Sequence, residues 1–150
     1  VEAAAELLKA DWKVHSDIWS LTSVNELRKD GLHCVRWNHM HPGEKSLVPY
    51  VAQQLDGRQG PVIAATDYMM SYTDQLREFI PGRYVTLGTD GYGRSDTREK
   101  LRSHFEVDRY FIAVAALNAL ADEGEFKHDD VKKAMKKYGI NPDKADPLTL

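Results

Sequence analysis

Hydrophobic positions along the chain predict helices that alternate with short strands. The clearest strand is 61–66 (PVIAAT), an apolar run typical of a strand buried on both faces. A second strand is predicted at 83–88 (RYVTLG), and a third at 14–21 (VHSDIWSL), where polar and apolar residues roughly alternate. Strands separated by helices favour an α/β fold with three layers, in which helices cover both faces of a mostly parallel sheet.

Helices are predicted from apolar residues at helical spacing and from the residues that begin and end them. The expected helices are 1–10, 24–30, 46–55, 67–79, 96–104, 108–124 and 129–138. Ser23 and Glu26 make a capping box, and Gly31 stands where a helix end prefers glycine. Asp96 and Asp108 are the expected caps of two later helices. The stretch 32–45 has no clear period and contains a Pro-Gly turn, so it is predicted to be a structured loop.

The first residues are predicted to be helical, although no capping residue stands before them. The segment 1–9 (VEAAAELLK) has no Ser, Thr, Asp or Asn before it and no initiator Met. We therefore expect residues 1–150 to be a single carboxy-terminal domain and a fragment of a larger multidomain chain. A further strand is expected upstream of Val1, which leaves the sheet without its first strand.

Composition narrows the class of protein. The chain has 150 residues, 42% of them hydrophobic and 29% charged, and a net charge of −3 with acidic and basic residues interspersed. This balance favours neither nucleic acid nor an anionic membrane surface. No apolar run approaches the ~20 residues that span a bilayer. Cys34 is the single cysteine, which excludes an internal disulfide and favours a cytoplasmic location.

Small polar residues follow each predicted strand. Thr22 and Ser23, Thr66 and Asp67, and Thr89 and Asp90 all occupy such positions. In a parallel sheet these pairs would gather at the carboxyl edge, where α/β proteins usually bind ligands. The same residue types also cap the helices that follow strands, and this structural interpretation is favoured.

The segment 91–98 (GYGRSDTR) is the most suggestive motif. Two glycines, a helix start and two arginines could hold a phosphate or a carboxylate, with Arg94, Ser95 and Arg98 as the candidate residues. The glycines match only part of a dinucleotide-binding fingerprint, because the third glycine is absent. The alternative is a tight turn whose arginines pair across an interface.

Cys34, His39 and His41 lie within eight residues and could ligate zinc, or act as a nucleophilic Cys-His pair. Their spacing matches no common structural zinc site, and a fourth ligand is not evident. A semi-buried cysteine beside loop histidines is the favoured interpretation.

Several strings are distinctive when taken together and in order. They are WSLTSVNELRKDG (19–31), CVRWNHMHP (34–42), VPYVAQQL (48–55), ATDYM (65–69) and LGTDGYGRSDTREKLRSHFEVD (87–108). The chain resembles the final, transketolase-like domain of the homodimeric-type pyruvate dehydrogenase family over nearly its whole length.

The resemblance implies a parent enzyme, an oxidoreductase of the pyruvate dehydrogenase complex that links glycolysis to acetyl transfer. Such a homodimer uses thiamine diphosphate and magnesium to decarboxylate pyruvate, and it acetylates the lipoyl group of the acetyltransferase component. In this family the cofactor lies between the two preceding domains. The chain has no GDG…N motif for the diphosphate and metal, since its TDGYG turn lacks a suitable Asn about thirty residues later.

The chain is therefore expected to be inactive alone, with no catalytic, cofactor-binding or metal-binding residue of its own. The implied role is structural: it supports the preceding domains and the second subunit of the homodimer. Two alternatives remain open. One is a docking module for another subunit of the complex, and the other is a regulatory small-anion site at the 91–98 turn.

Overall fold

The computed structural model describes residues 1–149 and contains a small parallel sheet at its centre. Strand β1 (Val62–Ala65) pairs with strand β2 (Tyr84–Leu87) in parallel, in a register that runs from Val62 opposite Tyr84 to Ala65 opposite Leu87. The two strands confirm the predictions for 61–66 and 83–88. In the part of the chain that the structure describes, these are the two strands of the sheet.

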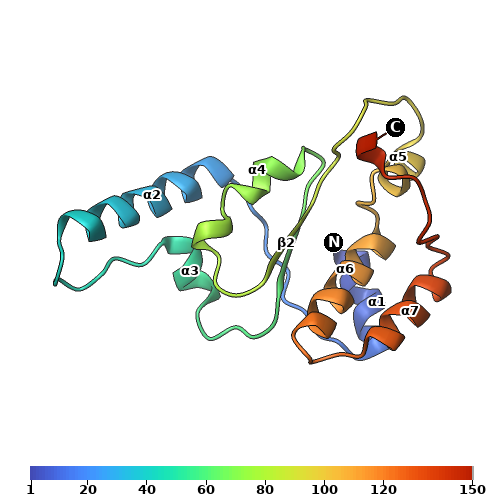
Figure 1. Ribbon diagram of the computed structural model, residues 1–150, viewed down its shortest axis with the longest axis horizontal. Coiled ribbons are helices and arrows are strands. Elements are labelled where there is room, and N and C mark those ends of the chain that lie inside the picture. The colour runs from blue at the N-terminus through green and yellow to red at the C-terminus, as the bar shows by residue number, and fades with distance from the viewer. Residues whose placement is uncertain (150) are drawn as a thin grey trace.

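Helices account for most of the remaining ordered elements (Figure 1). They are α1 (Glu2–Trp12), α2 (Val24–Met40), α3 (Tyr50–Leu55), α4 (Met70–Asp74), α5 (Arg98–His104), α6 (Arg109–Asp122) and α7 (His128–Lys137), with the short 3-10 turns η1 (Arg77–Phe79) and η2 (Pro147–Thr149). Asp108 caps α6 as predicted, because its carboxylate accepts hydrogen bonds from the N–H groups of Tyr110 (2.8 Å) and Phe111 (3.0 Å).

Side chains of the strands alternate between two buried clusters, as the two faces of a sheet require. Ile63 and Leu87 pack against a cluster formed by α1, α6 and α7. Ala64 and Tyr84 belong to a second cluster, which is supplied by α2, α3 and the segment around Phe79. Helices therefore cover both faces, and the predicted three-layer α/β architecture is confirmed.

The predicted strand at 14–21 is wrong. No residue of this segment is in a strand, and the side chains of Ile18, Trp19 and Leu21 are exposed. The segment is an extended connection held by Arg58, which donates a hydrogen bond to Asp17 (2.8 Å) and lies 5.8 Å from the centre of the Trp19 ring. Alternating polarity alone does not make a strand when no neighbouring strand is available to pair with it.

Helix α2 is longer than predicted, and the expected loop at 32–45 is largely helical. Gly31 lies inside the helix and does not end it. A Cβ atom at Gly31 would approach the Phe79 ring to 2.6 Å, so this glycine allows the aromatic ring to lie against the helix backbone. The Ser23 cap is confirmed, since Ser23 Oγ accepts a hydrogen bond from the N–H of Glu26 at 3.3 Å.

Other helix boundaries differ from the prediction as well. The expected helix at 46–55 begins only at Tyr50, because residues 46–49 are not helical and Pro49 stands at the cap of α3. The expected helix at 67–79 is reduced to α4 and η1, and it begins at Met70. The cap of α5 is Thr97, whose Oγ1 accepts from the N–H of Lys100 at 3.4 Å. Asp96 instead accepts a hydrogen bond from the N–H of Thr97 (2.7 Å), so the prediction of Asp96 as the cap was wrong by one residue.

Figure 1 shows how the helices are arranged along the long axis of the molecule. Helices α1, α6 and α7 pack together at one end of the long axis, and the outer part of α2 projects at the other end. Both marked chain ends lie on the side of the helix bundle.

Candidate functional site at the glycine turn

The turns that follow β1 and β2 lie against each other at the carboxyl edge of the sheet. A Cβ atom on Gly88 would come within 2.4 Å of the Met70 backbone nitrogen and 2.7 Å of the Tyr68 carbonyl oxygen. The absence of a side chain at Gly88 therefore permits the backbones to meet. The Thr89 N–H donates to the Tyr68 carbonyl oxygen at 2.9 Å and fixes this approach.

The polar residues at this edge are occupied by structural hydrogen bonds. Met70 is the first residue of α4, and its N–H donates a hydrogen bond to Asp90 Oδ2 at 2.6 Å. Thr89 Oγ1 donates to the Asp67 carbonyl oxygen at 2.8 Å, and Thr66 Oγ1 accepts from the N–H of Tyr68 at 3.1 Å. The structure thus brings two of the three predicted pairs together, and both pairs serve to cap and brace the turns.

Thr22 and Ser23, the third predicted pair, do not lie at this edge of the sheet. Ser23 caps α2, and the segment before it is not a strand of the sheet. The prediction that all three pairs share one sheet edge was therefore wrong for Thr22 and Ser23.

The glycine turn itself packs against the end of the chain. Gly91 has φ 120°, a conformation that L side chains rarely adopt, and a Cβ there would lie 2.3 Å from the Pro147 carbonyl oxygen. Nearby, the Lys144 ammonium donates to the His104 carbonyl oxygen (2.7 Å) and to the Glu106 carboxylate (2.8 Å). The tail is therefore fixed beside the turn and α5.

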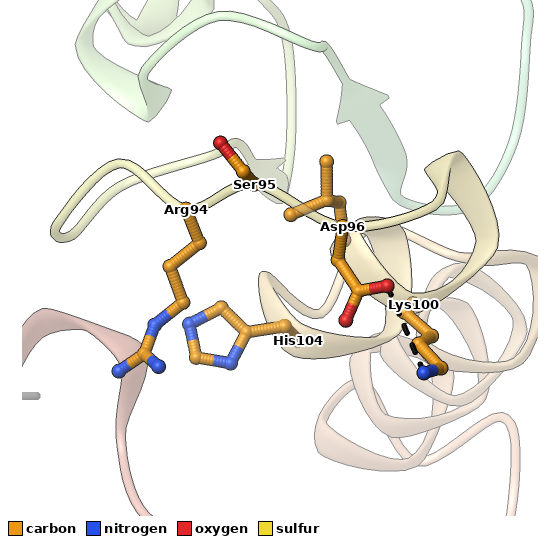
Figure 2. Close-up of a pocket in the computed structure, with 6 residues that line it drawn as sticks. Arg94, Ser95, Asp96, Lys100 and His104 are labelled. Atoms are coloured by element: carbon orange, nitrogen blue, oxygen red, sulfur yellow. Dashed lines mark ion pairs between the residues drawn. The ribbon is translucent and has the colours of Figure 1, made fainter.

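An open pocket of about 350 Å³ lies between the turn and α5. It is lined by Arg94, Ser95, Asp96, Lys100, Leu101 and His104. Arg94 and His104 both belong to this lining, and Asp96 pairs with Lys100 across 3.7 Å (Figure 2). Arg94 and Lys100 are cationic and His104 can be protonated, whereas Asp96 is the acidic residue of the lining. A small anion is the ligand class that such a lining suits best.

The predicted site residues are only partly brought together. Arg94 and Ser95 line the pocket, as the sequence suggested, but Arg98 does not. The sequence missed Lys100 and His104. Both follow from helical spacing once α5 is known, because positions four apart lie on one helix face.

The Cys34, His39 and His41 cluster does not converge. Cys34 is buried on the core side of α2, whereas His39 is exposed. His41 Nδ1 donates a hydrogen bond to the Trp37 carbonyl oxygen at 2.8 Å. The His41 ring also stacks on the Trp37 ring, with 4.2 Å between the ring centres. Burial, followed by the nearby Asp30 carboxylate, raises the pKa of the Cys34 thiol, which disfavours the nucleophilic thiolate.

Within residues 1–149, no group of three His, Cys, Asp or Glu side chains is arranged to hold a metal ion. Nor does any helix in that range combine the length and apolar composition needed to cross a membrane.

Comparison with known proteins places the domain. Residues 1–108 match the family described as "Transketolase-like TK C-terminal domain". The chain belongs to this family, and the small parallel sheet covered by helices agrees with it.

Proteins named "Pyruvate dehydrogenase E1 component" are similar over nearly the whole chain. The protein from Pseudomonas aeruginosa is 54% identical over 99% of this chain, and that from Cupriavidus necator is 53% identical over 100%. The protein from Escherichia coli (strain K12) is 48% identical over 98%. The chain spans only 16–17% of the length of these relatives. The resemblance noted from the sequence strings is confirmed.

Proposed function

We propose that this chain is the carboxy-terminal domain of a pyruvate dehydrogenase E1 component, where it supports the preceding domains and the homodimer. The observation that carries this proposal is about 50% identity across the whole chain to relatives six times longer. Structural side-chain contacts support it as well. The polar residues at the sheet edge cap and brace turns, and the strands join two buried clusters.

The parent that we infer is a cytoplasmic enzyme that decarboxylates pyruvate and transfers the acetyl group to a lipoyl group. Thiamine diphosphate would supply the electron sink for decarboxylation, with magnesium holding its diphosphate. Among residues 1–149, no three His, Cys, Asp or Glu side chains are grouped to hold a metal ion. The catalytic residues would accordingly belong to other parts of the parent.

Two measurements test the proposal. The purified 150-residue chain should neither release CO2 from pyruvate nor bind thiamine diphosphate in a calorimetric titration. The parent enzyme lacking these residues should dissociate at higher protein concentration than the intact parent in sedimentation experiments. Turnover by the chain alone would contradict the structural role.

The pocket beside α5 favours a second function, a regulatory site for a small anion. Arg94 and His104 both line the pocket (Figure 2) and can each donate hydrogen bonds to an anion. The test is Arg94→Ala combined with His104→Ala in the full enzyme, assayed with inorganic phosphate and with phosphorylated metabolites, and Arg98→Ala, outside the pocket lining, is the control. An unchanged response to every anion would remove this function.

Docking of the lipoyl acetyltransferase component stays a third proposal, for which the exposed apolar side chains of the domain are the supporting feature. Calorimetric titration of the parent enzyme with the acetyltransferase core, with and without residues 1–150, tests it. Equal heats for both forms would place the docking surface elsewhere in the parent.

A further inference from the structure

Residues 141–149 run from the end of α7 toward α5 and the glycine turn (Figure 1). We call this segment the strap. Pro147 is buried and Lys144 is half-buried, whereas the other residues of the strap are exposed. Most of the strap therefore faces solvent, and two residues attach it to the rest of the domain.

The first attachment is on the helix side of the pocket. The Lys144 ammonium donates to the His104 carbonyl oxygen at 2.7 Å and to the Glu106 carboxylate at 2.8 Å, and it lies 5.7 Å from the centre of the Phe111 ring. The His104 carbonyl is one of the last of α5, which have no partner within the helix. Glu106 has φ 62°, a left-handed conformation that residues other than glycine rarely adopt. Lys144 thus satisfies the end of α5 and stabilises the strained link that leads to α6.

The second attachment is on the turn side of the pocket. Gly91 has φ 120°, and a Cβ atom there would overlap the Pro147 carbonyl oxygen. The strap backbone therefore lies against the turn backbone at a position where only glycine fits. The pocket residues of this side, Arg94, Ser95 and Asp96, follow Gly91 by three to five positions.

The walls of the pocket have little support from the core of the domain. No residue of α5 (Arg98–His104) is buried, and residues 91–97 are all exposed. A helix of seven residues is unstable by itself in water. An ion pair of 3.3 Å between Arg102 and Asp67 also joins α5 to the turn after β1, but exposed pairs contribute little. We therefore expect the position of α5 relative to the turn to depend on the strap.

An anion in the pocket would need both walls at a fixed separation. Arg94 belongs to the turn, whereas Lys100 and His104 belong to α5 (Figure 2). The strap is attached to both walls, and both attachments are contacts within this domain that require no other part of the parent. Docking of the strap and binding of an anion thus favour the same arrangement, and two such events strengthen each other reciprocally.

We propose that the strap sets the separation of the two pocket walls and thereby controls the affinity of the pocket for a small anion. This inference rests on the proposed anion site and names what regulates it. Release of the strap lowers the affinity, and a bound anion in turn keeps the strap docked. Lys144 acts as a positioning residue, because it does not line the pocket and reaches it through the His104 backbone.

The test uses the full-length parent enzyme with Lys144→Met, which removes the ammonium and keeps the aliphatic chain. Circular dichroism checks that the fold is retained. The dissociation constant for inorganic phosphate, measured by calorimetric titration, should rise about fivefold or more. Amide hydrogen exchange of residues 98–105 should become faster by about tenfold, because α5 opens more often without the strap.

Two control variants accompany Lys144→Met. Lys136→Met removes an exposed lysine of α7 and the same unit of charge, and it should leave both measurements within about twofold of the unchanged enzyme. Arg94→Ala with His104→Ala should abolish the heat of phosphate binding that belongs to this pocket. Its amide exchange at α5 should stay close to that of the unchanged enzyme, because the backbone carbonyl at position 104 still accepts from Lys144.

Gly91→Ala tests the turn side of the strap independently. A Cβ atom at this position displaces Pro147, so the dissociation constant for phosphate should rise as it does for Lys144→Met. Gly93→Ala is the matched control, because a Cβ atom there meets nothing within 4 Å. It should leave the dissociation constant within about twofold.

Phosphate binding at the pocket that is unchanged in both Lys144→Met and Gly91→Ala would overturn the inference and leave the proposed anion site in place. Weaker binding in Lys144→Met without faster exchange at α5 would also overturn it, because loss of charge would then be the cause. If the enzyme shows no heat of phosphate binding that Arg94→Ala with His104→Ala removes, the proposed anion site itself fails, and the control by the strap fails with it.

Discussion

Helices α6 and α2 have opposite environments in the structure. Helix α6 has 14 residues, and six of them are buried: Ile112, Ala113, Ala116, Leu117, Ala119 and Ala121. Helix α2 has 17 residues, of which Val24, Gly31 and Cys34 are buried. Helix α6 is stabilised by tertiary packing on several sides, whereas α2 exposes apolar residues that its own chain leaves uncovered. A helix can thus form in this chain with many of its residues buried, as in α6, or with few, as in α2.

The largest difference should come from truncating one leucine in each helix. Leu117 is fully buried in the cluster of α1, α6 and α7, so Leu117→Ala should lower the free energy of unfolding by about 2–5 kcal/mol, through lost burial and the cavity left behind. Leu32→Ala, at an exposed position, should change it by about 0.5 kcal/mol or less. Urea unfolding of the 150-residue chain measures both.

Equal losses for the two leucine variants would show that α2 is packed as tightly as α6, and the comparison of the two helices would fail.

The second comparison is between two glycines of the same turn. Gly88→Ala forces a Cβ to 2.4 Å from a backbone nitrogen that cannot easily move, and should cost about 1–3 kcal/mol. Gly93 has nothing within 4 Å of its Cβ position and does not need a positive φ, so Gly93→Ala should be close to neutral. Thermal unfolding of the two variants in parallel gives the difference. A neutral Gly88→Ala would show that the two turns do not meet as described.

A smaller effect is expected at the cap of α2. Ser23→Ala removes the side-chain acceptor for the Glu26 N–H and should lower the free energy of unfolding by about 1 kcal/mol. Since α2 has little tertiary packing, part of this loss should appear as fraying of its first turn, detectable by amide hydrogen exchange. Thr22→Ala, one residue earlier, is the matched control. A loss of the same size there would mean that capping is not the cause.

The smallest effect is electrostatic and depends on pH. Hydrogen bonds from the Lys137 ammonium (2.6 Å) and the Tyr138 hydroxyl (2.9 Å) lower the pKa of Asp11 below its ordinary value. Because the pKa is lower in the folded state, this stabilisation is present above the usual carboxyl pKa of about 4 and is lost as the pH falls through the lowered value. Asp11→Asn should therefore lower the urea midpoint at pH 6, and the difference should fade toward pH 3.

Glu26→Gln is the counterpart of that variant on α2, since Glu26 pairs with Lys29 in an exposed i,i+3 pair. Its effect should be negligible at pH 6, as is usual for exposed pairs. A larger effect for Glu26→Gln than for Asp11→Asn would reverse the expected order of the two regions.

Local sequence patterns predicted the elements that are specified by residues close together in the chain. The apolar runs of β1 and β2, the Asp108 cap and the end of α7 near Gly139 all agree with the structure. For the candidate site, the sequence identified Arg94 and Ser95 but not Lys100 and His104. The sequence also suggested Arg98, which does not line the pocket. Closeness along the chain does not determine which side chains of a turn face the same pocket.

The sequence by itself determined the Ser23 and Asp108 caps, the positions of β1 and β2, and the similarity to the E1 components. These follow from the local chain and from composition, so no long-range contact is needed to read them. Tertiary structure decided the role of Gly31, which continues a helix because the Phe79 ring lies against it. It also decided that 14–21 is not a strand and that the outer part of α2 is exposed. Each of these depends on what a distant segment places beside the residue, which sequence periodicity does not encode.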